Sequence, residues 1–164
     1  MFGYRVRWLY NMKQRGIADM LTERLLVICP ACDGVNRVPS QRLGADPKCG
    51  HCHRPLFTGT PVALDESRFT RYLGRDELPL LVDFWAPWCG PCRAMAPAFE
   101  SAAQALEPAF RLAKVNTEES QSLGARLGIR SIPTMVLFRR GAEVARTSGA
   151  MDARSIVAWA RQAS

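Results

Sequence analysis

The chain has 164 residues, of which 48% are hydrophobic and 23% are charged, and its formal net charge at pH 7 is +7. This composition is typical of a folded globular protein and excludes a chain that is disordered throughout. The length suffices for one ordinary domain with a small second one. No apolar run approaches the roughly 18–20 residues that cross a bilayer, so we expect no transmembrane helix.

The positive charge lies mainly in the first part of the chain. Residues 1–60 carry +5 of the net +7, with nine basic and four acidic side chains. These basic residues form no dense stripe with interleaved aromatic side chains. The charge therefore argues against a nucleic-acid partner, and we expect a solvated basic surface.

Residues 1–24 form an N-terminal extension without a clean helical or strand period, and they are a candidate for disorder. Their basic residues precede only a four-residue apolar run at 25–28, which is too short for the apolar core of a signal peptide. We therefore expect a cytoplasmic protein. Met20 lies nine residues before the first cysteine, so translation starts at either Met1 or Met20.

Residues 25–57 contain four cysteines in two Cys-x-x-Cys pairs that 16 residues separate. The pairs are Cys29 with Cys32 and Cys49 with Cys52. This spacing is typical of a structural zinc site with four thiolate ligands. Such a short segment has too little core to fold alone, so one zinc ion per chain would supply much of its folding free energy. Two disulfides are the alternative, which a reducing compartment disfavours. His51 and His53 could substitute as ligands, but four thiolates already complete the shell.

Residues 58–61 are predicted as a linker, and from residue 62 to 164 strands and helices alternate. The expected strands are 62–64, 78–85, 110–115, 134–138 and 143–147, and the expected helices are 65–73, 92–106, 119–127 and one that Asp152 caps. The order βαβαβαββα predicts an α/β fold with a central mixed sheet and helices on both faces. The strongly apolar run 78–85 predicts a strand that is buried on both faces.

The third cysteine pair, Cys89-Gly90-Pro91-Cys92, joins that apolar strand to a helix. Unpaired N–H groups and the macrodipole at a helix N-terminus stabilise an anion, and the thiolate is the nucleophile of disulfide exchange. The two-residue spacing lets Cys92 attack a mixed disulfide formed on Cys89. A plain structural disulfide, or half of a metal site, is the alternative. A loop this short gives little entropic stabilisation, and no second Cys or His pair remains for a metal, so redox chemistry is favoured.

Residues 61–164 resemble the thioredoxin family. The matching segments, in the same order along the chain, are 82–92, 113–116, 128–134 and 149–150. The resemblance implies the thioredoxin fold and a reductant of protein disulfides. A thioredoxin reductase, which is an NADPH-linked flavoprotein, would reduce it again, and no organic cofactor would stay bound. Gly-Pro between the cysteines resembles the reducing members, whereas oxidases and isomerases often carry His there.

The resemblance also implies roles for matching residues. Asp83 would accept the proton of the Cys92 thiol, with a pKa that burial raises, and Lys114 would lie near it. An aspartate at an exposed strand end and a surface lysine are the alternatives. Pro133 would be cis and would present the preceding backbone to an extended client. The other matching residues would form an uncharged patch around Cys89: Trp88, Gly90, Pro91, Ile132, Gly149 and Ala150.

A four-cysteine segment in front of a Trp-Cys-Gly-Pro-Cys domain resembles bacterial thioredoxin 2, over about residues 25–164. The resemblance implies clients such as ribonucleotide reductase, peroxiredoxin and methionine sulfoxide reductase, and we expect a monomer. Zinc-bound thiolates remain oxidisable, so the metal is either structural only or also regulatory. Three other functions stay open: a zinc-ribbon binding module that carries a redox domain, a chaperone controlled by zinc loss, and an oxidase or isomerase of disulfides.

Overall fold

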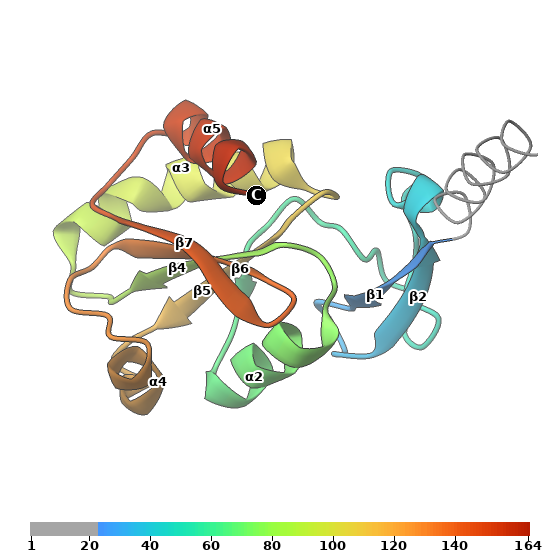
Figure 1. The fold of residues 1–164 in the computed structure, drawn as a ribbon, viewed down its shortest axis with the longest axis horizontal. Helices are drawn as coiled ribbons and strands as arrows, with labels where there is room; N and C mark the ends of the chain where they lie inside the picture. Colours follow the sequence, from blue (N-terminus) through green and yellow to red (C-terminus); the bar gives the residue numbers. More distant parts are fainter. Residues whose placement is uncertain (1–22) are drawn as a thin grey trace, which may run out of the picture.

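The computed structural model describes residues 23–164. Figure 1 shows a large sheet with helices on both faces and a two-stranded sheet beside it. The alternative translation starts and most of the extension 1–24 lie outside the described residues. Within the described part of the chain, no helix combines the length and the apolar character needed to cross a membrane.

The large sheet is mixed, as predicted, and has the strand order β3-β5-β4-β6-β7. Its strands are β3 (Val62–Ala63), β4 (Leu80–Trp85), β5 (Arg111–Asn116), β6 (Thr134–Arg139) and β7 (Ala142–Ser148). The central strand β4 pairs in parallel with β5 and antiparallel with β6. Its residues are buried on both faces up to Trp85, which confirms the prediction from the apolar run.

Four helices cover this sheet, α3 and α5 on one face and α2 and α4 on the other (Figure 1). Their bounds are α2 (Glu66–Arg75), α3 (Gly90–Leu106), α4 (Gln121–Arg126) and α5 (Ala153–Ala163). Asp65 and Asp152 cap α2 and α5 by accepting backbone N–H groups, and the cap at Asp152 confirms the prediction from the sequence. Helix α3 starts two residues before the predicted Cys92, because Pro91 suits the first turn of a helix, where its missing N–H is not needed.

Residues 24–57, here called the small unit, contain β1 (Arg24–Ile28), β2 (Val35–Pro39) and a 3-10 turn, η1 (Ser40–Arg42). The antiparallel strands β1 and β2 help to enclose a core that includes Val27, Cys29 and Leu56. Leu78, which belongs to the large unit (residues 62–164), completes that core. Ile28 points the other way and joins the core of the large unit. The two units therefore bury apolar side chains in each other.

Polar contacts along the free edge of β1 also join the units. The N–H of Leu26 donates to Glu77 Oε2 at 2.6 Å, and the N–H of Glu77 donates back to the Leu26 carbonyl at 2.9 Å. The N–H of Ile28 donates to Asp76 Oδ2 at 3.2 Å, and Arg111 donates to the Ile28 carbonyl at 3.1 Å. The large unit thus satisfies these four backbone groups of an edge strand, which would otherwise need water.

Arg111, at the start of β5, is fully buried at the junction of the units. Besides Ile28, it donates to the Leu56 carbonyl at 3.0 Å and to Glu107 Oε1 at 3.2 Å. Glu107 in turn accepts the N–H of Gly59 at 2.8 Å, within the predicted linker. The segments on both sides of the four cysteines are therefore fixed to one buried cation.

Candidate redox site and metal centre

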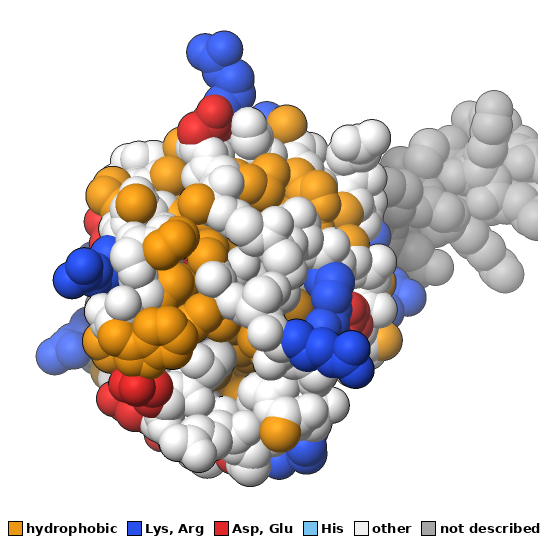
Figure 2. Space-filling model, turned by 90° about the vertical axis from the view of Figure 1, so that its left-hand side faces the viewer, with side chains coloured by type: hydrophobic (Ala, Val, Ile, Leu, Met, Phe, Trp, Pro, Cys, Tyr) orange, Lys and Arg blue, Asp and Glu red, His pale blue; other side chains and the backbone are white. Residues whose placement is uncertain are grey.

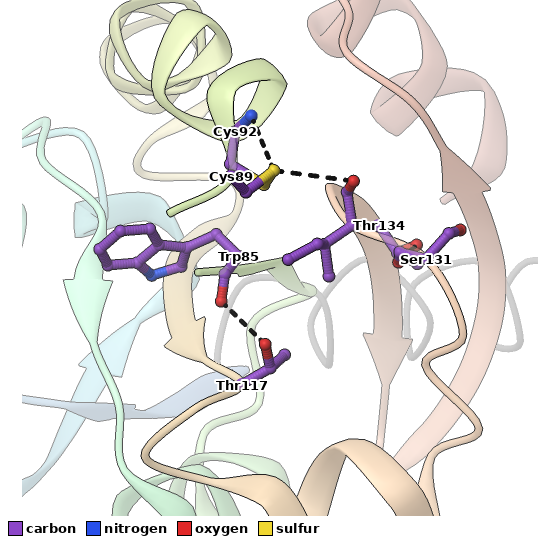
Figure 3. Close-up of a disulfide and its surroundings, with 7 residues drawn as sticks. Trp85, Cys89, Cys92, Thr117, Ser131 and Thr134 are labelled. Carbon is purple, nitrogen blue, oxygen red and sulfur yellow. Dashed lines mark hydrogen bonds between the residues drawn. A yellow bond between two sulfur atoms is a disulfide. The ribbon is translucent and has the colours of Figure 1, made fainter. Parts of the chain in front are cut away.

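The predicted redox pair lies where β4 passes into α3. Cys89 is the N-cap residue of α3, and its sulfur accepts the Cys92 N–H at 3.2 Å (Figure 3). The two cysteines form a disulfide. Cys89 therefore lies at the positive end of a helix, the placement expected to stabilise a thiolate there after reduction.

A backbone carbonyl faces the pair from the loop that precedes β6. The Ile132 carbonyl oxygen lies 3.8 Å from Cys89 Sγ. In the disulfide, Cys89 Sγ carries no proton and cannot donate a hydrogen bond to this carbonyl. Only the reduced thiol could do so. The Ile132–Pro133 bond is cis, as the resemblance implies. The loop therefore places a main-chain acceptor beside the sulfur that would react.

The surface around the cysteines is apolar and open. Trp88 is 67% exposed, whereas Cys89 is only 4% exposed. Figure 2 looks at this end of the molecule, where hydrophobic side chains form a band with charged groups at its margins. Among the residues expected to form the patch, Ile132 is half-buried and five are exposed: Trp88, Gly90, Pro91, Gly149 and Ala150.

Asp83 lies inside the sheet, on β4, and is 1% exposed. Neither carboxylate oxygen has a hydrogen-bond partner among the described residues. Burial raises the pKa of Asp83 to about 7, against the opposing charge of Lys114. Lys114 is its register partner on β5, and the Lys114 Nζ lies 4.8 Å from the centroid of the Trp85 ring. The structure thus brings Asp83 and Lys114 together, as expected.

Sequence reasoning assigned no role to three hydroxyl residues around this site. Thr117 donates its hydroxyl to the Trp85 carbonyl at 3.1 Å, which joins the end of β4 to the segment after β5 (Figure 3). Thr134 donates to the Ser131 carbonyl at 2.6 Å and lies 2.8 Å from the Ser148 hydroxyl. No local pattern distinguishes these residues from ordinary strand residues, so only the structure could find them.

The four remaining cysteines form a candidate metal centre in the small unit. The sulfur atoms of Cys29, Cys32, Cys49 and Cys52 all lie within 4.8 Å of one another. Two of the pairs, Cys29 with Cys52 and Cys32 with Cys49, are 3.6 Å apart. A tetrahedral zinc ion with Zn–S bonds of ~2.3 Å requires sulfur separations of about 3.8 Å. The four thiols are therefore close enough to one another to bind a single zinc ion.

The pKa shifts differ among these cysteines. Burial raises the pKa of Cys29. At Cys32 the Gly34 N–H lowers the pKa, but burial and the neighbouring thiols outweigh it and raise the pKa to about 12.

Neighbouring donors favour the thiolate form at Cys49. Burial raises the pKa of Cys49, but the N–H groups of Cys52 and His51 and the Asn36 amide outweigh it and lower the pKa to about 6. The exposed His51 and His53 side chains are not part of the cluster that the described residues form. The cluster thus contains the four cysteines that their spacing singled out.

The redox pair and the metal cluster lie at opposite ends of the large sheet. Strand β4 runs from Leu80, next to the small unit, to Trp85, next to the redox pair (Figure 1). Its six residues span roughly 20 Å at about 3.3 Å per residue. The metal cluster is therefore not part of the surface around Cys89.

Comparison with known proteins assigns both units. The family model described as thioredoxin matches residues 60–162, and the model described as the N-terminal part of thioredoxin 2 matches residues 28–54. "Thioredoxin C-3" of Corynebacterium nephridii is 41% identical over 138 residues, which cover 84% of this chain and 94% of that protein. "Thioredoxin 1" of Synechococcus elongatus is 43% identical over 90 residues, 55% of this chain and 84% of that protein. The solved structure of a mutant thioredoxin from Halobacterium salinarum is 27% identical, with a TM-score of 0.58 over 65% of this chain and 92% of that one.

Proposed function

Since the chain belongs to the thioredoxin family and is a thiol–disulfide oxidoreductase, we propose that it is a cytoplasmic protein-disulfide reductase. The Cys89–Cys92 dithiol would act on disulfide-bearing clients, and an NADPH-dependent thioredoxin reductase would restore it. The observation that carries this proposal is the N-cap position of Cys89 beside the exposed Trp88. Gly90 and Pro91 between the cysteines favour reduction over oxidation, as in the reducing members of the family.

The reaction transfers two electrons from the dithiol to the client. The Cys89 thiolate attacks one sulfur of the client disulfide, so that the client S–S bond breaks, a mixed disulfide forms and one client thiolate leaves. The Cys92 thiol then loses its proton and attacks the Cys89 sulfur. The second client thiolate leaves, takes up a proton from solvent, and the Cys89–Cys92 disulfide remains.

Asp83 is the group that accepts the Cys92 proton in this proposal. Its unpaired, buried carboxylate and its pKa of about 7 suit a base that works at neutral pH. We expect the rate of the second step to rise as the pH increases through about 7, because the ionised carboxylate is the base. Stopped-flow measurement of mixed-disulfide decay would show this rise in the wild type and not in Asp83→Asn.

Clients would bind in extended form across the apolar surface around Cys89. Trp88 and Pro91 would supply contact area, and the backbone at Ile132 and Pro133 would pair with the client main chain. The resemblance favours ribonucleotide reductase, peroxiredoxin and methionine sulfoxide reductase as clients of a monomer. The zinc ion would bind the four thiolates of the small unit and cross-link its two turns, a structural role.

Insulin reduction coupled to NADPH oxidation tests the proposal. With thioredoxin reductase present, wild type should oxidise NADPH in proportion to the insulin reduced, and Cys89→Ser should not. The small-unit variant Cys32→Ser is the matched cysteine control, and it should retain the activity. Insulin reduction with dithiothreitol but not with NADPH and reductase would contradict the proposed electron donor.

A further inference from the structure

Three contacts from β7 and from the residue after it, Gly149, hold the loop that faces Cys89. The loop, residues 127–133, runs from the end of α4 to the cis proline. One contact is a backbone bond, from the Gly149 N–H to the Pro133 carbonyl at 2.9 Å. The other two use the side chains of Arg146 and Ser148, which lie two residues apart and so on the same face of the strand.

Arg146 holds the start of the loop. Its guanidinium donates to the Leu127 carbonyl at 2.8 Å and to the Gly128 carbonyl at 3.4 Å, at the C-terminal end of α4. Glu143 accepts two further hydrogen bonds from the same guanidinium, at 2.6 and 2.7 Å. This second pair of bonds fixes the plane of the guanidinium, so the loop contacts have a defined direction.

Ser148 holds the end of the loop through Thr134. The buried Thr134 hydroxyl has one proton, and the Ser131 carbonyl, at 2.6 Å, is an acceptor only. The Thr134 oxygen must therefore accept the proton of Ser148 across their 2.8 Å separation. The resulting chain runs from Ser148 to Thr134 to Ser131, one residue before Ile132.

We propose that Arg146 and Ser148 are positioning residues, which fix loop 127–133 so that the Ile132 backbone meets an extended client beside Cys89. The inference rests on the proposed reductase function. Neither side chain is next to the cysteines in sequence, and both act through the loop that they bind. Because the Gly149–Pro133 backbone bond remains in side-chain variants, the loop should lose alignment without losing its fold.

The test compares a protein client with a small disulfide. Insulin uses the loop backbone for pairing, whereas a small aromatic disulfide such as dithiobis-nitrobenzoate reaches Cys89 without it. The loss of one neutral hydrogen bond changes an equilibrium constant about three- to tenfold. We expect Ser148→Ala to raise the insulin KM by about that factor, with kcat and the small-disulfide rate within twofold of wild type. Arg146→Met should act in the same direction, and Ser148→Thr, which keeps the hydroxyl, should restore the KM.

Thr147→Val is the matched control, since it removes a hydroxyl from the same strand but on the opposite face, and it should leave both rates unchanged. Equal losses on insulin and on the small disulfide in Ser148→Ala would overturn the inference, because they would indicate general damage to the site. An unchanged insulin KM would overturn it too. If wild type itself fails to reduce insulin, the proposed function fails instead, so the two failures are distinguishable.

Discussion

One aspartate is buried toward each end of the large sheet, and the two differ in their hydrogen-bond partners. Asp76, at the end with the small unit, accepts the N–H groups of Ile28 and Leu78 at 3.2 and 3.0 Å and lies 3.8 Å from Arg111. Asp83, toward the redox end, has no hydrogen-bond partner among the described residues. Burial raises both pKa values, to about 6 for Asp76, where Arg111 opposes it, and to about 7 for Asp83.

This difference separates a structural carboxylate from the one that we propose as a proton acceptor. At the small-unit end, the buried Asp76 and Arg111 lie close to each other and bind backbone groups of both units. Removing one of the two side chains therefore leaves buried polar groups without a partner. At the redox end, Asp83 makes no hydrogen bond among the described residues, and the charge of Lys114 offsets only part of the cost of its burial. A buried titratable group without a structural partner is a typical sign of function.

Removing the zinc should give the largest loss of stability. The loss should be confined to the small unit. Structural zinc sites contribute on the order of 10 kcal/mol to the folding of small domains. We expect a chelator, under reducing conditions, to abolish hydrogen-exchange protection across residues 24–57. The rate of insulin reduction should remain within about twofold, because Cys89 lies at the far end of β4. Activity that falls in step with zinc content would contradict this separation of the two ends.

Arg111→Met should be the most destabilising single substitution at the junction of the units. It leaves Asp76 and Glu107 buried without their cation and two carbonyls without a donor, which predicts a loss of about 3–5 kcal/mol. Arg126→Met is the matched control, because the ion pair of Arg126 with Glu66 is exposed and should be worth at most about 1 kcal/mol. Urea denaturation measures both, and similar losses would refute the role of the junction.

Alanine at the two aspartates should give effects of opposite sign. Asp76→Ala leaves two buried N–H groups without an acceptor and removes the carboxylate that lies 3.8 Å from Arg111, so we expect a loss of about 3 kcal/mol. Asp83→Ala leaves no group without a partner. A rise in pKa from 3.8 to about 7 corresponds to about 4 kcal/mol, part of which the small cavity offsets, so a gain of about 2–4 kcal/mol at pH 8 is expected.

The gain in Asp83→Ala should depend on pH. Because folding raises the pKa of Asp83, the native wild type binds more protons than the unfolded chain between about pH 4 and 7. Its stability therefore falls as the pH rises through that range. Urea denaturation at pH 8 and at pH 4 should show a large advantage of the variant at pH 8 and a much smaller one at pH 4. An advantage independent of pH would mean that the Asp83 charge is not its source.

Most of the redox site and the four candidate zinc ligands could be predicted from the sequence. Short-range patterns located Cys89 at a strand–helix junction and the four zinc-ligand candidates by their spacing, and alternating elements predicted the mixed sheet. Asp83 lies within an apolar strand, where an unpaired carboxylate is costly, and the resemblance to thioredoxin supplies its expected role. For Cys89 and Asp83 the signal lies within a few neighbouring residues.

The junction between the units and the support of loop 127–133 have no such local signal. Arg111 is a single basic residue near the start of a strand, and its partners Ile28 and Leu56 lie 83 and 55 positions away. Ser148 pairs with Thr134 only because of the β6–β7 register, which shifts between Leu137 and Phe138. Counting residue pairs outward from the turn gives the wrong register beyond such a bulge. The pairing of Ser148 with Thr134 could therefore not be predicted from the sequence.

Trapping of the mixed disulfide tests the central claim most directly, since it identifies the sulfur that attacks the client. Reduced Cys92→Ser, mixed with insulin, should accumulate a covalent adduct on Cys89, which mass spectrometry would locate. Dithiothreitol should cleave this adduct by reducing the mixed disulfide. Cys89→Ser, treated in the same way, should form none. An adduct on Cys92, or none in either variant, would contradict the assignment of Cys89 as the nucleophile.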